Sequence, residues 1–351
     1  MPADHGHPAA VADRDFVDDV TAAVRWWRAQ RTWRVTSSHT GGGVISAFEE
    51  AVAQQVGPEA YALALPSGTA ALKTALEITG VGPGDQVGVP ALDWTATGAV
   101  LRALGARAVP LPVVRETGLL DVAEVARREL ARDLSAIVAV HLHGLTCDVP
   151  ALRRARPGLP IIEDAAQAWA ACYPDGSPAG SAADACAFSF GAAKSPSAGE
   201  LGCLVTSTSG LYRNAAALTQ HPTRQLLAGV TCPRADQVMT RVAPVAALLG
   251  AFVIHRHAAR IPALRQAAGY VARALQDAEL PVLTDPAKHA PGIIAVSAAP
   301  AEVRPLLPRQ PLPGGLVIGT VDSGDVSFSP GYAEEAAGRD PRITVVAVAV
   351  P

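Results

Sequence analysis

The sequence predicts an α/β fold with a mostly parallel sheet that is covered by helices on both faces. From about residue 59, short β-rich runs alternate with amphipathic helical segments, a spacing typical of consecutive β-α-β units. Beyond Gln220 the pattern changes to a long helical stretch and then to a Pro-rich segment with scattered strand-like runs. We therefore expect a large domain over residues 1–220, and a connecting helix with a small C-terminal α+β domain over residues 221–351.

The composition agrees with this division and excludes several classes of protein. The chain has 351 residues, of which 49% are hydrophobic, enough for one large domain and a smaller one. A net charge of -3 argues against a nucleic-acid partner, because such surfaces usually carry an excess of basic residues. The longest apolar stretch, VAPVAALLGAFVI, is too short to span a bilayer, and the five cysteines are scattered and odd in number. We expect a soluble cytoplasmic protein without a membrane partner, a disulfide framework or a metal site.

A leading helix over residues 15–30 precedes the expected sheet. Trp26 and Trp27 lie near its end and Trp33 follows; core packing explains these aromatic residues better than an interface or a substrate-binding stripe. The strands expected in the large domain are YALAL, QVGVP, RAVPLPV, SAIVAVH, LPIIED, DACAFSF and GCLVTS.

The part of the chain after Gln220 is expected to begin with helix. Residues 237–276 are apolar at helical spacing and contain Pro244 and Pro262, which we expect to kink the helix. Three strand-like runs follow and would form the small domain: GIIAVSA, GLVIGTV and ITVVAVAV.

The segment PSGTAAL, residues 66–72, follows the first expected strand and opens a helix. Small residues at such a junction let backbone N–H groups approach a phosphate, and the helix dipole favours an anion there. Ser67, Gly68 and Thr69 would form this cradle. Taken alone, the segment is more often a plain helix start with Ser67 or Thr69 as the N-cap.

Two carboxylates, Glu163 and Asp164, end the expected strand LPIIED. The carboxyl ends of parallel strands are where ligands bind in open α/β sheets. Asp164 also precedes the helical-looking AAQAWA. Taken alone, it is therefore more readily explained as a helix N-cap.

Lysine is rare in this chain. Of its 29 basic residues only Lys73, Lys194 and Lys288 are lysines. Lys194 follows the apolar strand DACAFSF in a loop of small residues, where desolvation lowers the pKa of an amine and suits it to imine formation. A guanidinium stays protonated and cannot take this role. Taken alone, Lys194 also fits an ordinary surface loop.

Together these three features predict one site at the ends of successive strands. A phosphate cradle, a carboxylate for a pyridinium nitrogen and a lysine for an imine are the protein groups that a pyridoxal phosphate (PLP) enzyme needs. We therefore expect PLP as the cofactor, with Lys194 and Asp164 as the catalytic residues.

Several blocks of the sequence, in the right order, resemble the DegT/StrS group of PLP-dependent aminotransferases, which mostly act on nucleotide-linked keto-sugars. They cover about residues 40–205 and read GGGVISAFEEAVAQQVG, SGTAAL, VGPGDQVGVPALDWTAT, GARAVPLPV, IVAVHLHGLTCDVPAL, IIEDAAQAWAACYPDGSPAGSAADACAFSF and K-x-x-x-A-G-E-x-G. The resemblance implies an aspartate-aminotransferase-like large domain of PLP fold type I. It also implies a homodimer with active sites at the interface.

The resemblance assigns roles to individual residues. Lys194 would bind the cofactor as an imine, and Asp164 would pair with its pyridine nitrogen. Gln167 would contact the phenolic oxygen, and Trp94 would stack on the ring face. The residues that would hold the phosphate are Ser67, Gly68, Thr69 and Ser189.

The substrate-binding residues are expected in less regular segments. Arg224, Arg234 and Arg241 follow the large domain, and we expect at least one of them to bind an anionic substrate. Met239 stands where the family usually has an Asn that reaches the partner subunit's phosphate. In HLHGLTC we expect a strand end rather than a metal cluster, with His143 lining the mouth of the site.

The expected function is transfer of an amino group from glutamate or glutamine to a keto or aldehyde acceptor, such as a sugar or a natural-product intermediate. Two alternatives stay open. One is a PLP enzyme of another reaction type on the same scaffold, such as a dehydratase, an aldolase or a cyclase. The other is a degenerate, non-catalytic partner subunit.

Overall fold

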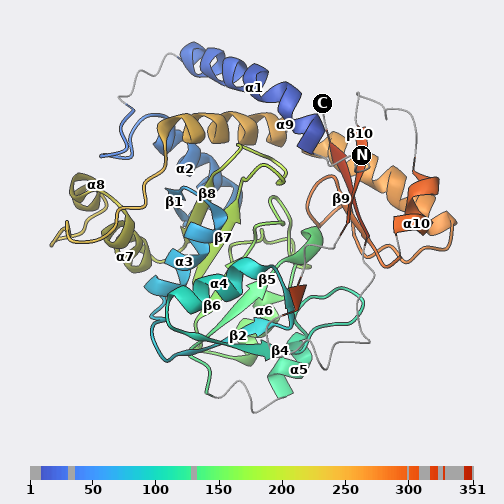
Figure 1. The fold of residues 1–351 in the computed structure, drawn as a ribbon, viewed down its shortest axis with the longest axis horizontal. Helices are drawn as coiled ribbons and strands as arrows, with labels where there is room; N and C mark the ends of the chain where they lie inside the picture. Colours follow the sequence, from blue (N-terminus) through green and yellow to red (C-terminus); the bar gives the residue numbers. More distant parts are fainter. Residues whose placement is uncertain are drawn as a thin grey trace, which may run out of the picture.

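The computed structural model describes residues 9–30, 36–127, 133–298, 300–307, 317–322, 327–328 and 344–349, so Trp33 lies outside the described residues. A central sheet is flanked by helices, and a smaller sheet lies to one side of it (Figure 1). The α/β class that the sequence predicts is confirmed. Among the described helices, none combines the length and the apolar character needed to cross a membrane.

The central sheet contains all seven strands that the sequence predicts. They are β1 (Tyr61–Leu65), β2 (Gln86–Pro90), β4 (Arg107–Leu111), β5 (Ala136–Val140), β6 (Ile161–Asp164), β7 (Ala185–Ser189) and β8 (Gly202–Thr206). Their order is β1-β8-β7-β6-β5-β2-β4, and only β8 runs antiparallel to its neighbours. The carboxyl ends of the other strands therefore meet at one edge of the sheet.

Alternate residues along a strand feed two different hydrophobic cores, which is why helices cover both faces. In β1, Leu63 and Leu65 pack into one core while Ala62 and Ala64 pack into the other. The helices over the first face are α3 (Gly68–Ile78), α4 (Thr95–Ala103) and α7 (Ser209–Thr219). Those over the second face are α2 (Val44–Val56) and α9 (Pro244–Asp277).

Short elements complete the large part of the fold and the small sheet. Near the central sheet lie β3 (Leu92–Asp93), α5 (Val122–Arg127), η2 (Leu142–Gly144), α6 (Val149–Ala155) and α8 (Pro222–Leu227). The remaining elements are β9 (Ile293–Val296), α10 (Pro300–Val303), η3 (Arg304–Leu306), β10 (Val317–Asp322), β11 (Ser327–Phe328) and β12 (Thr344–Ala349). The small sheet has the antiparallel order β10-β12-β9. The expected domain boundary at residue 220 falls between α7 and α8, and that division remains a prediction.

Two helices at the top of the view pack against each other: α1 (Ala9–Ala29) runs along α9 (Figure 1). The Trp26 ring lies 6.0 Å from that of Phe252 on α9, as expected for core packing. The prediction for Pro244 is wrong. It is the first residue of α9 rather than a kink, because a proline lacks the N–H that would be unpaired at that position. Pro262 lies inside α9, which continues past it to Asp277.

Gly250 allows α9 to approach α2 closely, and its substitution should be destabilising. A Cβ at Gly250 would lie 2.8 Å from Cδ2 of the fully buried Phe48 and would also meet Leu201. We expect Gly250→Ala to lower the free energy of unfolding by about 1–3 kcal/mol through overpacking. The matched control is Gly269→Ala on the same helix, where a Cβ meets nothing within 4 Å. That variant should gain about 0.5–1 kcal/mol from helix propensity. Urea unfolding measures both, and equal effects would contradict this account of the packing.

Candidate active site

The predicted site residues gather where the parallel strands end. β1 leads into Ser67, β5 leads into His143, and β6 ends at Asp164. β7 ends at Ser189, and the loop that follows it carries Lys194. Chain topology thus places residues that lie far apart in the sequence at one edge of the sheet.

The loop after β1 forms a tight cradle against the end of β7. A Cβ on Gly68 would lie 2.6 Å from Cβ of Ser189, so only glycine allows this approach. The Ser67 hydroxyl accepts a hydrogen bond from the Ala70 N–H at 3.2 Å and caps α3, while Thr69 is exposed. The helix-cap interpretation of this segment is therefore correct. It is also compatible with anion binding, since N–H groups of the first turn stay available at the positive end of the helix dipole.

Asp164 and Lys194 act on each other electrostatically. Burial raises the pKa of the Asp164 carboxyl, and the Lys194 charge opposes that shift. Burial lowers the pKa of the Lys194 amine, and Asp164 opposes that shift in turn. Among the described residues, the Lys194 amine makes no hydrogen bond and no ion pair, whereas Lys73 is bonded to Glu77 at 2.6 Å. Burial thus favours the neutral form of the Lys194 amine, and this amine interacts electrostatically with the Asp164 carboxyl.

The segment after Asp164 is not the helix that the sequence predicts. Residues 165–170 form turns, and an Asp164 carboxylate oxygen accepts a hydrogen bond from the Ala166 N–H at 3.0 Å. Asp164 therefore caps no helix, and that alternative explanation of the carboxylate is removed. The turn brings Gln167 back toward η2, where its side-chain oxygen accepts a hydrogen bond from the His143 backbone N–H at 2.8 Å.

His143 and Trp94 border the same strand ends. His143 has a left-handed backbone with φ 56°, and burial lowers the pKa of its imidazole to about 4, so the ring is neutral at neutral pH. It follows β5 in a 3₁₀ turn, so it does not share a strand with His141. Trp94 precedes α4 and is 44% exposed, an unusual degree for tryptophan. Its ring face is therefore available for stacking.

A fully buried hydrogen bond between a histidine and a glutamate lies beneath the site. The His141 Nε2 lies 3.0 Å from a Glu163 carboxylate oxygen, and its Nδ1 accepts a hydrogen bond from the Cys147 N–H at 3.0 Å. Burial alone would raise the pKa of Glu163, but hydrogen bonds from His141, Tyr173 and the Gly180 N–H lower it overall. Glu163 therefore anchors the chain below the site, while its neighbour Asp164 faces the site.

The three predicted substrate arginines have different surroundings. Arg224 is buried and donates hydrogen bonds to Glu49 at 2.5 Å and to Gln220 at 3.1 Å, so it has a structural ion pair instead of the expected anion. Arg234 is exposed and lies 3.3 Å from an oxygen of Asp236. Within the described part of the chain, only Arg241 of the three has no carboxylate partner.

Arg241 lies in a cluster with two histidines, His39 and His221, which sequence reasoning missed. Its guanidinium reaches the Ser38 hydroxyl at 3.5 Å. Nearby, the rings of His39 and His221 stack with centroids 4.3 Å apart and an interplanar angle of 10°. Burial, His39 and Arg241 together lower the pKa of His221. No sequence pattern signals this cluster, because its members come from segments about 180–200 residues apart.

Sequence reasoning also missed Asp93. It lies at the end of β3 directly before Trp94, and it is only 4% exposed. The signal was present: LDW places a carboxylate after an apolar strand, the same pattern that singled out Asp164.

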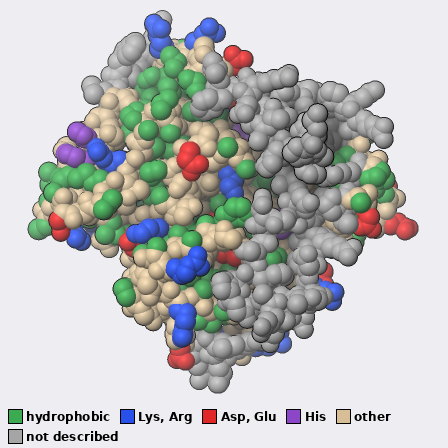
Figure 2. Space-filling view, in the orientation of Figure 1, with side chains coloured by type: hydrophobic (Ala, Val, Ile, Leu, Met, Phe, Trp, Pro, Cys, Tyr) green, Lys and Arg blue, Asp and Glu red, His purple; other side chains and the backbone are tan. Residues whose placement is uncertain are grey.

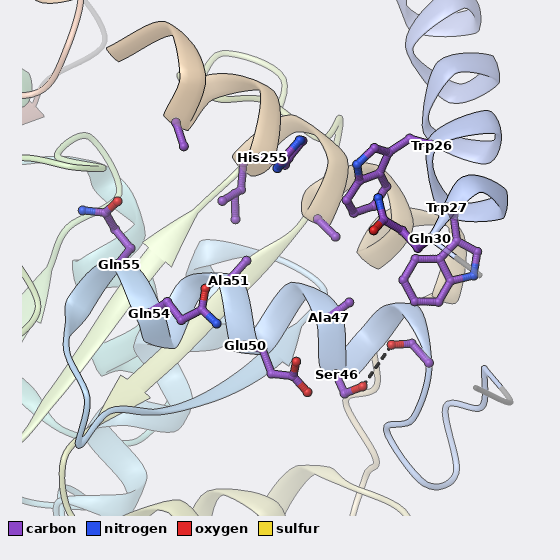
Figure 3. Close-up of a pocket in the computed structure, with 14 residues that line it drawn as sticks. Trp26, Trp27, Gln30, Ser46, Ala47, Glu50, Ala51, Gln54, Gln55 and His255 are labelled. Carbon is purple, nitrogen blue, oxygen red and sulfur yellow. Dashed lines mark hydrogen bonds between the residues drawn. The ribbon is translucent and has the colours of Figure 1, made fainter. Parts of the chain in front are cut away.

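A separate cavity of about 610 Å³ lies between α1, α2 and α9 (Figure 3). Trp26 and Trp27 of α1 and His255 of α9 line it, and Ala47 and Ala51 of α2 point toward them (Figure 3). None of the predicted site residues lines this cavity, so it is distinct from the strand-end site.

The whole chain was compared with known proteins. Residues 28–302 match the DegT/DnrJ/EryC1/StrS aminotransferase family. The chain belongs to this family. It is 37% identical over 211 residues to the L-glutamine:2-deoxy-scyllo-inosose aminotransferase of Streptomyces fradiae, covering 59% of this chain and 46% of that protein. It thus spans about half the length of the curated relatives that it matches.

Solved structures share the fold. The crystal structure of 3-amino-5-hydroxybenzoic acid synthase matches with a TM-score of 0.70 and 22% identity, covering 94% of this chain and 90% of that one. The PLP form of a putative sugar aminotransferase from Streptococcus pneumoniae matches with a TM-score of 0.67 and 21% identity, covering 95% and 90%. These likenesses confirm a PLP fold type I architecture, and family membership implies dependence on PLP.

The residues present fit this cofactor. Because Gly68 has no side chain, the start of α3 lies directly against Ser189, and this brings the N–H groups of the first turn near the Ser189 hydroxyl. Lys194 supplies an amine without a partner among the described residues, Asp164 a carboxyl, and Trp94 an exposed aromatic face.

Proposed function

We propose that this chain is a PLP-dependent aminotransferase that moves an amino group from an amino-acid donor to a keto or aldehyde acceptor. The observation that carries the proposal is Lys194, whose amine has no partner among the described residues and sits where its charge interacts with that of Asp164. Burial lowers the pKa of this amine, which favours the neutral, nucleophilic form. The Gly68–Ser189 cradle nearby supports a phosphate-bearing cofactor.

The residues have separate tasks in this proposal. When bound, PLP supplies an aldehyde that forms imines with amines and a pyridine ring that accepts electrons. Lys194 holds and returns a proton at Nζ as the general acid and base. Asp164 keeps the proton on the ring nitrogen, Gln167 binds the phenolic oxygen, and Trp94 covers the ring. The phosphate is held by Ser67, Gly68, Thr69 and Ser189.

The proposed donor is glutamine or glutamate, and the proposed acceptor is a carbonyl group on a sugar-like ring or a natural-product intermediate. The name of the Streptomyces fradiae relative supports this choice, since it pairs L-glutamine with 2-deoxy-scyllo-inosose. A donor carboxylate needs a cationic partner, and the cluster of Arg241, His39 and His221 supports that role.

A homodimer with shared sites is part of the proposal. Four large apolar side chains between α8 and the start of α9 are 59–88% exposed: Leu226, Leu227, Val238 and Val245. Figure 2 shows hydrophobic side chains gathered over α8 at the left of the molecule. Such a patch is typical of a protein interface. His221 of the cluster directly precedes α8, which supports a role of the cluster in the partner's site. The proposed location is the cytoplasm, supported by five free cysteines.

Lys194 should carry the covalent link to the cofactor. We expect the protein reconstituted with PLP to be yellow, and borohydride reduction followed by peptide mapping to place the adduct on Lys194. Lys194→Ala and Lys194→Arg should both lose activity, on the order of 10⁴-fold or more, because the chemistry needs an amine and not only a charge. Lys73→Arg is the control and should behave like the wild type. A reducible adduct that persists in Lys194→Ala would disprove the assignment.

Arg241 should set the affinity for the amino donor. We expect Arg241→Ala to raise the KM for glutamine or glutamate by about 10- to 100-fold, the loss of one or two charge-assisted hydrogen bonds, with a smaller change in kcat. Arg234→Ala is the matched control, because its guanidinium lies on the surface beside Asp236. Equal KM values in the two variants would remove Arg241 from donor binding.

Shared sites can be tested by mixing two defective variants. Lys194→Ala and Arg241→Ala subunits, unfolded and refolded together, should recover about a quarter of the wild-type activity at low donor concentration. Random association makes half of the dimers mixed. In each mixed dimer, one of the two sites combines an intact Lys194 from one subunit with an intact Arg241 from the other. Recovery should coincide with a dimer in light scattering. A monomer, or a mixture no better than its parts, would contradict the shared site.

A further inference from the structure

Asp93 is a buried carboxyl that the proposed chemistry does not use. One of its oxygens accepts a hydrogen bond from the Trp94 backbone N–H at 2.6 Å. Its other oxygen, Oδ2, is fully buried and has no hydrogen-bond partner among the described residues. The Thr97 hydroxyl lowers the pKa of Asp93, yet it is also buried and makes no hydrogen bond of acceptable geometry within the same part of the chain. A carboxylate left this way is costly, because buried polar atoms are normally paired.

The charges around Asp93 make its ionisation harder still. Burial raises the pKa of Asp93 to about 7, and the Asp164 charge adds to the shift, while Thr97 and the Trp94 N–H oppose it. Lys194 and His141 act in turn on Asp164, and each of them lowers the pKa of its carboxyl. On the other side, β3 pairs with β11, where Ser327 is aligned with Asp93. The carboxyls of Asp93 and Asp164 therefore interact with each other, whereas the pyridine nitrogen of PLP would pair with only one carboxyl.

We propose that Asp93 is a positioning residue of the active site: it holds a proton at Oδ2 while the site is empty, and it releases that proton when a cation pairs with Asp164. The inference rests on the proposed function only for the identity of that cation, the protonated ring nitrogen of PLP. The O–H bond of Asp93 breaks and the proton passes to the solvent. Neighbouring carboxylates resist ionising together, and a cation against Asp164 removes the repulsion.

This proton loss would also fix Trp94. A carboxylate accepts a stronger hydrogen bond than a carboxylic acid does, so ionised Asp93 binds the Trp94 N–H more tightly. Trp94 begins the turn into α4, and its ring is the proposed cover of the cofactor. Asp93 thus acts through Trp94 and Asp164 and need not touch the reacting atoms.

The first test uses the protein without cofactor. In Asp93→Asn the amide oxygen can still accept from Trp94, but the residue no longer titrates. A carboxyl whose folded-state pKa is raised stabilises fully below its unfolded-state pKa, and this stability is lost as the pH rises to about 7. The wild type should therefore lose stability relative to Asp93→Asn as the pH rises. The unfolding equilibrium constant of the wild type, divided by that of Asp93→Asn, should increase about tenfold per pH unit between pH 5 and 7 and should change little at higher pH.

The matched control is Asp85→Asn. Hydrogen bonds from Ser135 and the Gly82 N–H lower the pKa of Asp85, so its ratio should be level from pH 5 to 8. If the ratio of unfolding constants for Asp93→Asn is also independent of pH, the inference is overturned, whether or not the enzyme proves to be an aminotransferase.

The second test counts protons on cofactor binding. PLP is titrated calorimetrically at pH 6 in buffers of different ionisation enthalpy, in a Lys194→Ala background so that imine formation adds no protons. The protein with Asp93 should release up to one proton more than the protein with Asp93→Asn. Equal proton counts would overturn the inference. If PLP does not bind to the protein with Lys194 intact either, the proposed function fails, while the stability test still decides whether Asp93 carries the proton in the protein without cofactor.

Discussion

The alignment of three neighbouring strands is the constraint on which the site depends. In the parallel ladder, Asp164 of β6 pairs with Val140 of β5 and with Ala187 of β7. The residues that follow these positions therefore leave the sheet at one level and on one edge. A shift of one residue in β6 would exchange Asp164 with Glu163 and turn the site carboxyl into the core. The ladder thus decides which of two adjacent carboxylates can meet Lys194.

Burial gives these groups their reactivity. The amine of Lys194 and the carboxyl of Asp164 both have pKa values shifted toward the neutral form, because the strand ends are poorly solvated. Glu163, one residue away, differs because His141, Tyr173 and Gly180 supply hydrogen bonds that favour its charged form. The same fold therefore keeps one carboxyl as a structural anion and another ready to receive a cationic ligand. Asp93 extends this contrast to a third carboxyl at the site.

Sequence reasoning recognised the sheet because its signals are local, and it selected the proposed cofactor residues by signals of the same kind. A β-rich run that is followed by SGTA, or that ends in ED as IIED does, specifies a strand and the residues at its end without knowledge of the rest of the chain. It failed where the signal depended on context. AAQAWA has the composition of a helix but forms turns, and Pro244 begins a helix instead of bending one. In the turn, the Gln167 side chain accepts a hydrogen bond from the distant His143 N–H. Pro244 occupies the first helical position, where a missing N–H costs nothing.

The sequence by itself determined the α/β class, the order of the strands along the chain and the presence of an amine, a carboxylate and a glycine cradle, since each is encoded within a few adjacent residues. Only the tertiary structure decided which charged groups are partnered. Arg224 and Arg241 look equivalent in the sequence, yet Arg224 meets Glu49 from 175 residues away while Arg241 lies beside His39 and His221. Contacts of this kind join distant segments, and the energy of a charge depends on the burial and the partners that those segments supply.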